Sequence, residues 1–389
     1  MVRWQNWSGK LNANAKDIHF LRSEADACAI ASYARNEGIS VRTAGATHSH
    51  APLVANDGLI VDARGLSGLI SADPEQESAW VWAGSRIFSL GQALHAHGLA
   101  LFNQGDIDEQ AIAGATATGT HGTGRDLKNL SAAVLGYRIA TATGELIDVD
   151  SSHPAFSAIR QHLGAFGIVT RVHLKLREAY RLKETTWEAD LDDLLSSSEE
   201  NIANNRHFEF FWYPQEDKGR AKTINETEDP AVYPISEEGT RCAWNYEVLP
   251  NYRPHKHTEM EYSIPRDRGI ECMEAIRKLL NDDFPDVQWP VEYRTLAADD
   301  VWLSTAYQRD TVTISVHQDV RLNEEPYYRA CEEVFSSFGG RPHWGKVNYL
   351  SGTQLEERHP KWNEWWQVRD QMDPTETFLN PYFKGIRPE

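Results

Sequence analysis

Two stretches of small residues have the composition best suited to binding a cofactor. Residues 42–50 read RTAGATHSH, and residues 114–124 read GATATGTHGTG, which holds only Gly, Ala and Thr apart from His121. Small side chains let backbone N–H groups approach an anion, and successive amides in a tight turn form a site for phosphate. The second stretch also suits a loop that lies against a flat cofactor. Neither stretch has the GxGxxG, GxxxxGKS or GxxxxGKT pattern, so a Rossmann or P-loop site is not predicted.

A second set of residues is charged and alternates along the chain. Glu292 and Arg294 are two residues apart in VEYRTL, so on a strand their side chains face the same way. A carboxylate and a guanidinium that point together into a pocket can orient a polyhydroxylated substrate through charge-assisted hydrogen bonds. Lys346 ends the segment RPHWGK. On these residues alone, a surface ion pair and a solvated lysine are the alternative interpretation.

The order of the motifs along the chain resembles the vanillyl-alcohol oxidase superfamily, and in detail its branch of sugar-1,4-lactone oxidases and alditol oxidases. The resemblance covers nearly the whole chain, and each motif alone would be weak evidence. The motifs are NWSG (6–9), GATHSH (45–50), ATGTHGTG (117–124), LGAFGIVTRV (163–172), HFEFFWYP (207–214), EMEYSIP (259–265), VEYRTLAADDVWLS (291–304), RPHWGK (341–346) and DPTETFLNPYF (373–383).

The resemblance implies an FAD cofactor bonded covalently to His48 through the flavin 8α-methyl group. An ordinary loop histidine is the alternative interpretation of His48. We expect the FAD contacts to come from the two small-residue stretches and from the later LGAFGIV turn. The expected contacts are Arg42, Ala44, Gly45, Ala46, Thr47, His48, Ser49, Thr116, Gly119, Thr120, His121, Gly122, Gly167 and Val169.

The resemblance also implies a substrate site beside the flavin, formed by Glu292, Arg294 and Lys346. Where alditol oxidases carry a His and a Thr two residues apart, this chain has Ser315 and His317. The polarity is kept but the geometry changes, which makes a lactone or a small sugar alcohol more plausible as the substrate. We therefore expect Glu292, Arg294, Ser315, His317 and Lys346 to bind the substrate.

The implied reaction is hydride transfer from a CH–OH group to flavin N5. Lys346 and Arg294 would stabilise developing alkoxide charge, and Glu292 would position the substrate. Either Glu292 or a water would accept the hydroxyl proton. We expect O₂ to accept the electrons and to give hydrogen peroxide. The alternatives are a dehydrogenase with another acceptor, an oxidase of a non-sugar alcohol, and a non-catalytic protein that binds flavin or sugar.

No metal site is predicted. His48 and His50 are two residues apart, but no further ligands with matching spacing accompany them. The histidines of HKH (255–257) are expected in a solvated loop. The four cysteines are scattered and contain no CxxC pair, so neither zinc nor a disulfide framework is indicated.

Periodicity and turn residues predict short elements of both kinds. A helix is expected to begin after the N-cap Ser23 and to end before Gly38, and a glycine-rich loop is expected from Ala111 to Gly124. A hairpin is expected with its turn at Thr143–Gly144, and a turn followed by a strand over 163–178. The other expected elements are strands at 39–43, 58–62 and 79–83 and a helix at 87–97.

These elements predict an α+β fold. A two-part FAD-binding domain of the vanillyl-alcohol oxidase (PCMH) type should span 1–178, and a substrate cap domain on a mixed or antiparallel sheet should span 179–340. Residues 341–389 should return to the flavin site, with RPHWGK and DPTETFLNP as loops. The late tryptophans, such as Trp344 and Trp362, are expected to pack in the core.

The charge balance narrows the classes of partner. With 57 acidic and 39 basic residues the net charge is −18, which repels nucleic-acid phosphates and anionic membranes. We expect a small neutral polyhydroxylated substrate and no nucleic-acid or membrane partner. No apolar stretch approaches the roughly 20 residues that span a bilayer, and the N-terminal segment has no apolar signal core. A cytoplasmic monomer is the expectation.

Overall fold

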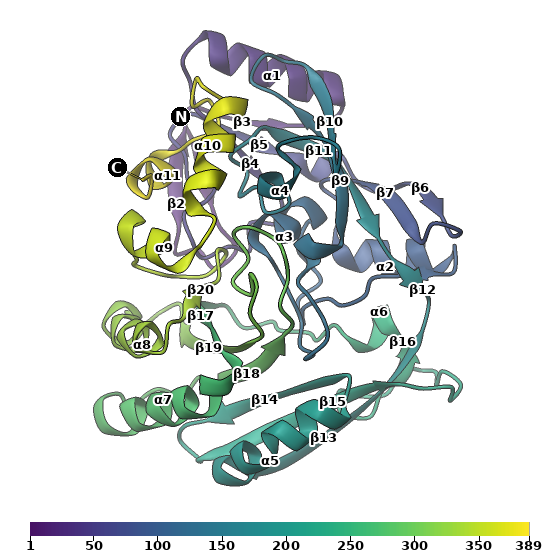
Figure 1. Ribbon diagram of the computed structural model, residues 1–389, viewed down its shortest axis with the longest axis vertical. Coiled ribbons are helices and arrows are strands. Elements are labelled where there is room, and N and C mark those ends of the chain that lie inside the picture. Colours follow the sequence, from purple (N-terminus) through teal and green to yellow (C-terminus); the bar gives the residue numbers. More distant parts are fainter. Residues whose placement is uncertain (389) are drawn as a thin grey trace.

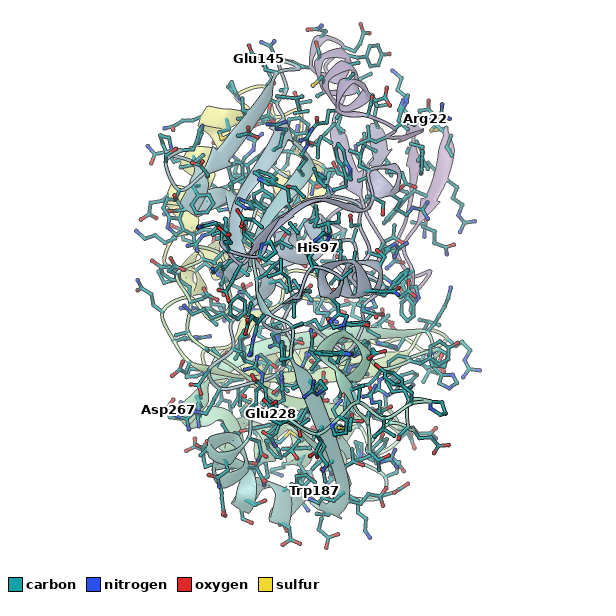
Figure 2. The ribbon with its side chains drawn as sticks, turned by 90° about the vertical axis from the view of Figure 1, so that its right-hand side faces the viewer. Arg22, His97, Glu145, Trp187, Glu228 and Asp267 are labelled. Atoms are coloured by element: carbon teal, nitrogen blue, oxygen red, sulfur yellow. The ribbon has the colours of Figure 1, made fainter. Side chains whose placement is uncertain are left out.

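The structure is a computed structural model that describes residues 1–388. It has two halves, which Figure 1 shows one above the other. Small sheets and the C-terminal helices form the upper half, and one large sheet with its helices forms the lower half. Figure 2 shows the long axis from the side, with Glu145 near one end, Trp187 near the other and His97 between them.

The upper half is built around two sheets. A parallel sheet has the order β3 (Asp17–Phe20), β5 (Leu59–Asp62), β4 (Val41–Ala44). An antiparallel sheet has the order β10 (Leu146–Asp150), β9 (Val134–Ala140), β11 (Ile168–Lys175), β7 (Ser78–Trp82), β6 (Leu69–Asp73). Two small ribbons pair β1 (Val2–Gln5) with β2 (Asn12–Ala15), and β8 (Leu99–Ala100) with β12 (Arg177–Glu178).

Helix α1 (Glu24–Asn36) forms as its sequence predicts. The Ser23 side chain caps it by accepting a hydrogen bond from the Asp26 amide, and Ala27, Ala31 and Ala34 form its buried face. The expected strands, the hairpin turn and the second helix, α2 (Ile87–His95), are also present, with ends that differ by up to three residues. A short helix α4 (Phe156–Ile159) precedes the turn before β11.

The expectation of a glycine-rich loop from Ala111 to Gly124 is wrong in its first half. Residues Ile112–Thr118 form helix α3. Alanines alternate with small residues here, and alanine is the strongest helix former. Gly119 ends the helix with a φ of 74°, a left-handed conformation that favours glycine. The loop proper is therefore confined to residues 119–124.

The lower half is an eight-stranded sheet in which every pairing is antiparallel, so the antiparallel alternative is correct and the mixed one is wrong. Helices α5 (Leu191–Asn204), α7 (Gly269–Asp283) and α8 (Glu325–Ser337) lie along its outer side, and α6 (Asn245–Val248) follows β16 (Figure 1). The strand order is β16 (Cys242–Trp244), β13 (Arg181–Asp190), β15 (Lys218–Glu226), β14 (His207–Tyr213), β18 (Val291–Leu296), β19 (Thr311–Asp319), β17 (His257–Pro265), β20 (Arg341–Pro342).

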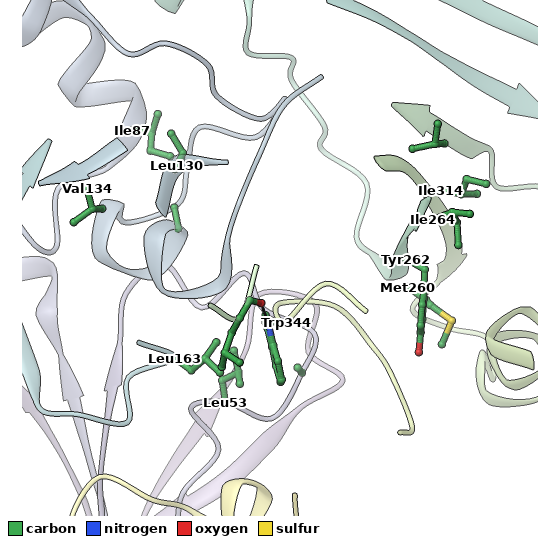
Figure 3. Packing of buried hydrophobic residues seen from close by; sticks show 14 of the residues in the cluster. Leu53, Ile87, Leu130, Val134, Leu163, Met260, Tyr262, Ile264, Ile314 and Trp344 are labelled. Atoms are coloured by element: carbon green, nitrogen blue, oxygen red, sulfur yellow. Dashed lines mark hydrogen bonds between the residues drawn. The ribbon is translucent and has the colours of Figure 1, made fainter. Parts of the chain in front are cut away.

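The C-terminal segment crosses back to the upper half. Helices α9 (Gly352–Arg358), α10 (Trp362–Met372) and α11 (Pro381–Gly385) lie beside the small sheets, and the sequence analysis had missed them. Trp344 is fully buried near Leu53 and Leu163, as Figure 3 shows. Trp362 is also buried, which confirms the prediction that the late tryptophans belong to the core.

Two further findings concern membrane-spanning helices and the cysteines. Within residues 1–388, no helix is both long and apolar enough to cross a membrane. All four cysteines are free.

Candidate functional site

A first cavity lies between the two small-residue stretches. The chain that leaves β4 supplies Gly45 to Ser49 to its wall, and helix α3 with the following Thr120 supplies the opposite wall. Gly167 and Val169 at the start of β11 close one end. A Cβ atom at Gly45 would lie 2.7 Å from the Cβ of Ala111, so the two walls approach closely only because residue 45 is glycine.

The first wall offers backbone donors to a ligand. Thr47 has a φ of 60°, which turns the chain sharply in the middle of this segment. Within the described residues, the amides of residues 46–49 donate no hydrogen bond to the protein. A run of amides without protein partners in a tight turn can bind an anion. The segment therefore fits the phosphates of a nucleotide cofactor.

His48 lines the first cavity with a neutral ring. It stacks on Trp7 with 5.2 Å between ring centroids and makes no hydrogen bond within residues 1–388. Burial, reinforced by the positive charges of Arg86 and Lys346, lowers the pKa of His48 to about 4. The imidazole thus keeps a free lone pair at neutral pH, which a bond to a flavin methyl group requires.

Not all the residues expected to contact FAD are placed to do so: five lie outside the lining of this cavity, and Arg42 borders it but is engaged elsewhere. Arg42 borders it, but its guanidinium donates to the carbonyl oxygens of Leu53, Leu163, Gly164 and Phe378 and therefore holds chain segments together. The Thr116 hydroxyl bonds inside helix α3, as helical threonines often do. Those outside the lining are Ala44, Thr116, Gly119, His121 and Gly122.

A second cavity, of about 590 Å³, lies against the inner face of the large sheet. Three neighbouring strands each present residues two apart to this face, namely Glu259 and Glu261 on β17, Glu292 and Arg294 on β18, and Ser315 and His317 on β19. The pairing aligns them, because Ser315 lies opposite both Glu261 and Glu292, and His317 lies opposite Glu259. Side chains opposite one another share a face of the sheet.

Arg294 is held by two carboxylates. Its Nη2 lies 2.6 Å from Glu261 Oε2 and 3.3 Å from Glu292 Oε2. Glu261 also accepts from Ser315 Oγ at 2.9 Å and lies 2.8 Å from His121 Nε2. His121 therefore belongs to the second cavity and not to the cofactor wall. The guanidinium enters the cavity in a fixed orientation.

Lys346 is held by Glu259. The Lys346 ammonium forms an ion pair with Glu259 Oε2, and the lysine side chain keeps 21% of its surface exposed. Sequence reasoning missed both Glu259 and Glu261. The signal was present, because EMEYSIP places two glutamates two residues apart, as VEYRTL places Glu292 and Arg294.

The three carboxyl groups differ in charge. Burial raises the pKa of Glu292 to about 8, against the opposing effect of Arg294. Burial also acts to raise the pKa of Glu259, but Lys346 and the nearby histidines hold it well below its usual range. His121 and Arg294 do the same for Glu261. Of these three groups, Glu292 is thus protonated at neutral pH, and Glu259 and Glu261 are carboxylates.

Two histidines face Glu259. His317 Nε2 lies 3.8 Å from Glu259 Oε1, and His257 Nε2 lies 3.9 Å from Glu259 Oε2. The prediction that HKH is a solvated loop holds for His255 and Lys256, which are exposed, but is wrong for His257. That ring lies against Trp7, Trp289 and His317, because β17 begins at residue 257 and carries it inward.

Clusters of potential metal ligands occur in this region. His50, His257 and Glu259 have ligand atoms within 4.8 Å of one another, as do His121, Glu261 and His343. In both clusters the carboxylate is already paired, with Lys346 or with Arg294. A metal ion would have to compete with these cations for the carboxylate, so we assign no metal to either cluster.

The two cavities meet. Gln110, Thr120, His343 and Lys346 line both of them, so the Lys346 ammonium stands at their junction. A flat cofactor in the first cavity would expose one edge or face to the second. Of the sequence-predicted substrate contacts, Glu292, Arg294, His317 and Lys346 line the second cavity, whereas Ser315 lies beneath it and bonds to Glu261.

Two family models match the chain. An FAD-binding domain family matches residues 17–150, and the D-arabinono-1,4-lactone oxidase family matches residues 172–252 and 233–386. An L-gulono-1,4-lactone dehydrogenase of Mycobacterium tuberculosis is 33% identical over 98% of each chain. An alditol oxidase of a Streptomyces species is 27% identical over 98% of each chain. A cholesterol oxidase structure from Brevibacterium sterolicum, 16% identical, superposes with a TM-score of 0.89 over 99% of this chain and 97% of that one.

Proposed function

Since the chain belongs to the D-arabinono-1,4-lactone oxidase family, we propose that it oxidises a CH–OH group of an aldono-1,4-lactone, with alditols as the second substrate class. It is an FAD-dependent oxidoreductase of the vanillyl-alcohol oxidase fold. The observation that carries the proposal is the junction of the two cavities at Lys346, where a cofactor site meets a polar site.

FAD fits the first cavity. The amides of residues 46–49 suit its diphosphate, and the small residues of α3 leave room for a flat ring system. We propose that His48 carries FAD covalently, which its neutral ring and its position on the cavity wall support. We also propose that residues 1–178 form the FAD domain, 179–340 the substrate domain and 341–389 a segment that returns to the flavin.

Bound FAD would supply the hydride acceptor, and the protein would position the substrate and stabilise the charge that develops on it. Arg294 and Lys346 present positive charge to the second cavity, where it would stabilise a developing alkoxide. Glu292, protonated at neutral pH, donates a hydrogen bond to a substrate oxygen and thereby positions the ring. Glu259 and Glu261 hold the two cations in place, so neither needs to reorganise during the reaction.

A lactone is favoured over an alditol by the side chains on β19. Ser315 is committed to Glu261 and is buried beneath the cavity, so only His317 offers a polar group from this strand. An open-chain alditol needs a hydrogen-bond partner for each of its hydroxyls. A five-membered lactone has fewer hydroxyls and a ring of fixed shape. Unpaired hydroxyls in a buried site are costly.

We propose O₂ as the electron acceptor, with hydrogen peroxide as the product. The M. tuberculosis relative is named a dehydrogenase, which favours a non-oxygen acceptor as the second candidate. The two are separated by following lactone oxidation in air and, under argon, with an artificial dye as acceptor. Peroxide at the rate of lactone consumption supports the oxidase, and turnover only with the dye supports the dehydrogenase.

The first test is an absorbance spectrum before and after acid precipitation. A yellow pellet is expected for the wild type, and a yellow supernatant for His48→Ala, because only the wild type can hold the flavin by a bond. A yellow wild-type supernatant contradicts the covalent link but leaves the reaction untouched. Anaerobic bleaching of the flavin by L-gulono-1,4-lactone or by xylitol then tests the reaction, and a flavin that neither reduces contradicts the proposed function.

A further inference from the structure

When an alcohol is oxidised by hydride transfer, a base must take the hydroxyl proton, and the second cavity offers few candidates. Arg294 and Lys346 are cations held in ion pairs. Glu292 keeps its proton at neutral pH, because burial raises its pKa to about 8. The ionised carboxylates are engaged as well: Glu261 by Arg294, Ser315 and His121, Glu259 by Lys346, and Asp106 by Asn251 and Arg253. Of the two acceptors that the sequence left open, Glu292 or a water, a protonated Glu292 is therefore the less suited.

The histidines differ in which nitrogen is free. His343 Nδ1 accepts from the Gly345 amide at 3.0 Å, so its other nitrogen carries the hydrogen and can only donate. His121 has both nitrogens within 2.8 Å of an oxygen. His317 is the reverse of His343. Its Nδ1 lies 2.8 Å from the Pro290 carbonyl oxygen, which can only accept, so Nδ1 carries the hydrogen and Nε2 is bare.

The bare Nε2 of His317 faces the reacting groups. Within residues 1–388 it makes no hydrogen bond, and it lies 3.8 Å from Glu259 Oε1. His317, Glu259 and Glu292 have ligand atoms within 4.8 Å of one another. The charged and titratable groups around it are His257 and Glu259 on β17, Glu292 on β18, and Lys346. Burial lowers the pKa of His317 to about 4, so the ring is neutral at physiological pH.

We propose that His317 is the catalytic base, with Nε2 taking the substrate hydroxyl proton. This inference rests on the proposed function. The O–H bond breaks and its proton goes to Nε2. The carbinol C–H bond breaks, its hydrogen leaves with the electron pair as hydride to FAD, and the C–O bond becomes C=O. Glu259, 3.8 Å away, stabilises the imidazolium that results, and the proton then passes to solvent. The Pro290 carbonyl keeps the ring in the required tautomer.

The test compares His317→Gln with the wild type in anaerobic stopped-flow reduction by L-gulono-1,4-lactone between pH 5 and 9. The limiting reduction rate should fall by about 10²- to 10⁴-fold, as for loss of a general base, while the apparent Kd changes by less than about threefold. Because the pKa of His317 lies near 4, the wild-type rate should stay nearly constant down to pH 5 and decline when the series is extended to pH 4, and the variant should lose that decline. His317→Ala should recover rate when imidazole is added, because the cavity has room for it.

A second readout does not depend on turnover. In the ¹⁵N-histidine spectrum of the holoenzyme, one neutral ring with a protonated Nδ1 and a bare Nε2 should vanish on His317→Gln. A variant that reduces within fivefold of the wild type overturns the inference, and so does a protonated Nε2. His257→Gln is the comparison, because its Nδ1 also faces a carbonyl oxygen, that of His255. A larger loss at His257 than at His317 also overturns it.

Failure of the proposed function can be distinguished from failure of the role of His317. If neither a lactone nor an alditol reduces the wild-type flavin, the substrate class is wrong. The nitrogen spectrum would still decide the tautomer on which the role of His317 depends.

Discussion

Replacing Glu292 with glutamine tests whether the second cavity holds this carboxyl in its neutral form. A glutamine has nearly the shape of a protonated glutamic acid and carries no charge. The side chain is buried next to Arg294, and burial raises its pKa from 4.5 to about 8. If the carboxyl is neutral in the folded protein, the substitution changes little at pH 6 and alters how stability depends on pH.

The expected size follows from proton binding. Between pH 4.5 and about 8 the folded state holds the Glu292 proton and the unfolded state does not, so this group's contribution to stability is full below pH 4.5 and falls as pH rises towards 8. The slope is about 1.4 kcal/mol for each pH unit. Over the interval from pH 6.0 to 7.5, the wild type should lose about 2 kcal/mol that the glutamine variant does not lose.

The assay is urea unfolding of both holoenzymes at pH 6.0 and 7.5, with the difference between the two proteins compared at each pH. Glu261→Gln is the matched control, because the same change on the neighbouring strand removes a carboxylate that pairs with Arg294 and His121. It should cost about 3–5 kcal/mol at both pH values, as expected for one partner of a buried ion pair. An identical pH dependence for wild type and Glu292→Gln would refute the reasoning.

Two further predictions concern the cofactor half. Arg42→Met should lower the free energy of unfolding by about 3–5 kcal/mol, measured by urea unfolding, because it leaves buried carbonyls without donors. A change below about 1 kcal/mol would contradict this role. Gly122→Ala should lower the free energy of unfolding by about 1–3 kcal/mol, since a Cβ there would meet the Gln104 carbonyl oxygen. Gly114→Ala, with no atom within 4 Å of its Cβ, should keep the stability and change the flavin content. Equal stability of the two alanine variants would refute the packing argument.

Local sequence signals predicted most of the upper half. Ser23 as a cap, the alanines of α1 and the Thr143–Gly144 turn act over a few residues, and the structure follows them. Helix α3 was missed because its glycine and threonines are poor helix formers, and burial of its alanines between the sheets overrides that propensity.

The candidate site was only partly predictable, for a physical reason. Glu292 and Arg294 are neighbours in sequence, so their common direction can be read from the alternation. Glu261 binds Arg294 from a strand more than thirty residues earlier, and that contact depends on the order in which β18, β19 and β17 lie side by side. Strand order is set by long-range packing, which no local pattern encodes.

The pairing register of β17, β18 and β19 determines which side chains face the second cavity. On β17, β18 and β19 the polar residues that face the cavity alternate with apolar residues such as Met260, Tyr293 and Val316, which are fully buried on the opposite face. A slip of one residue in any of these strands would drive two polar side chains into the layer under α7 and α8 and turn apolar ones to the substrate. The cost of burying unpaired charge opposes every such slip. The groups that would bind the substrate therefore also hold the strands in the one alignment that brings them together.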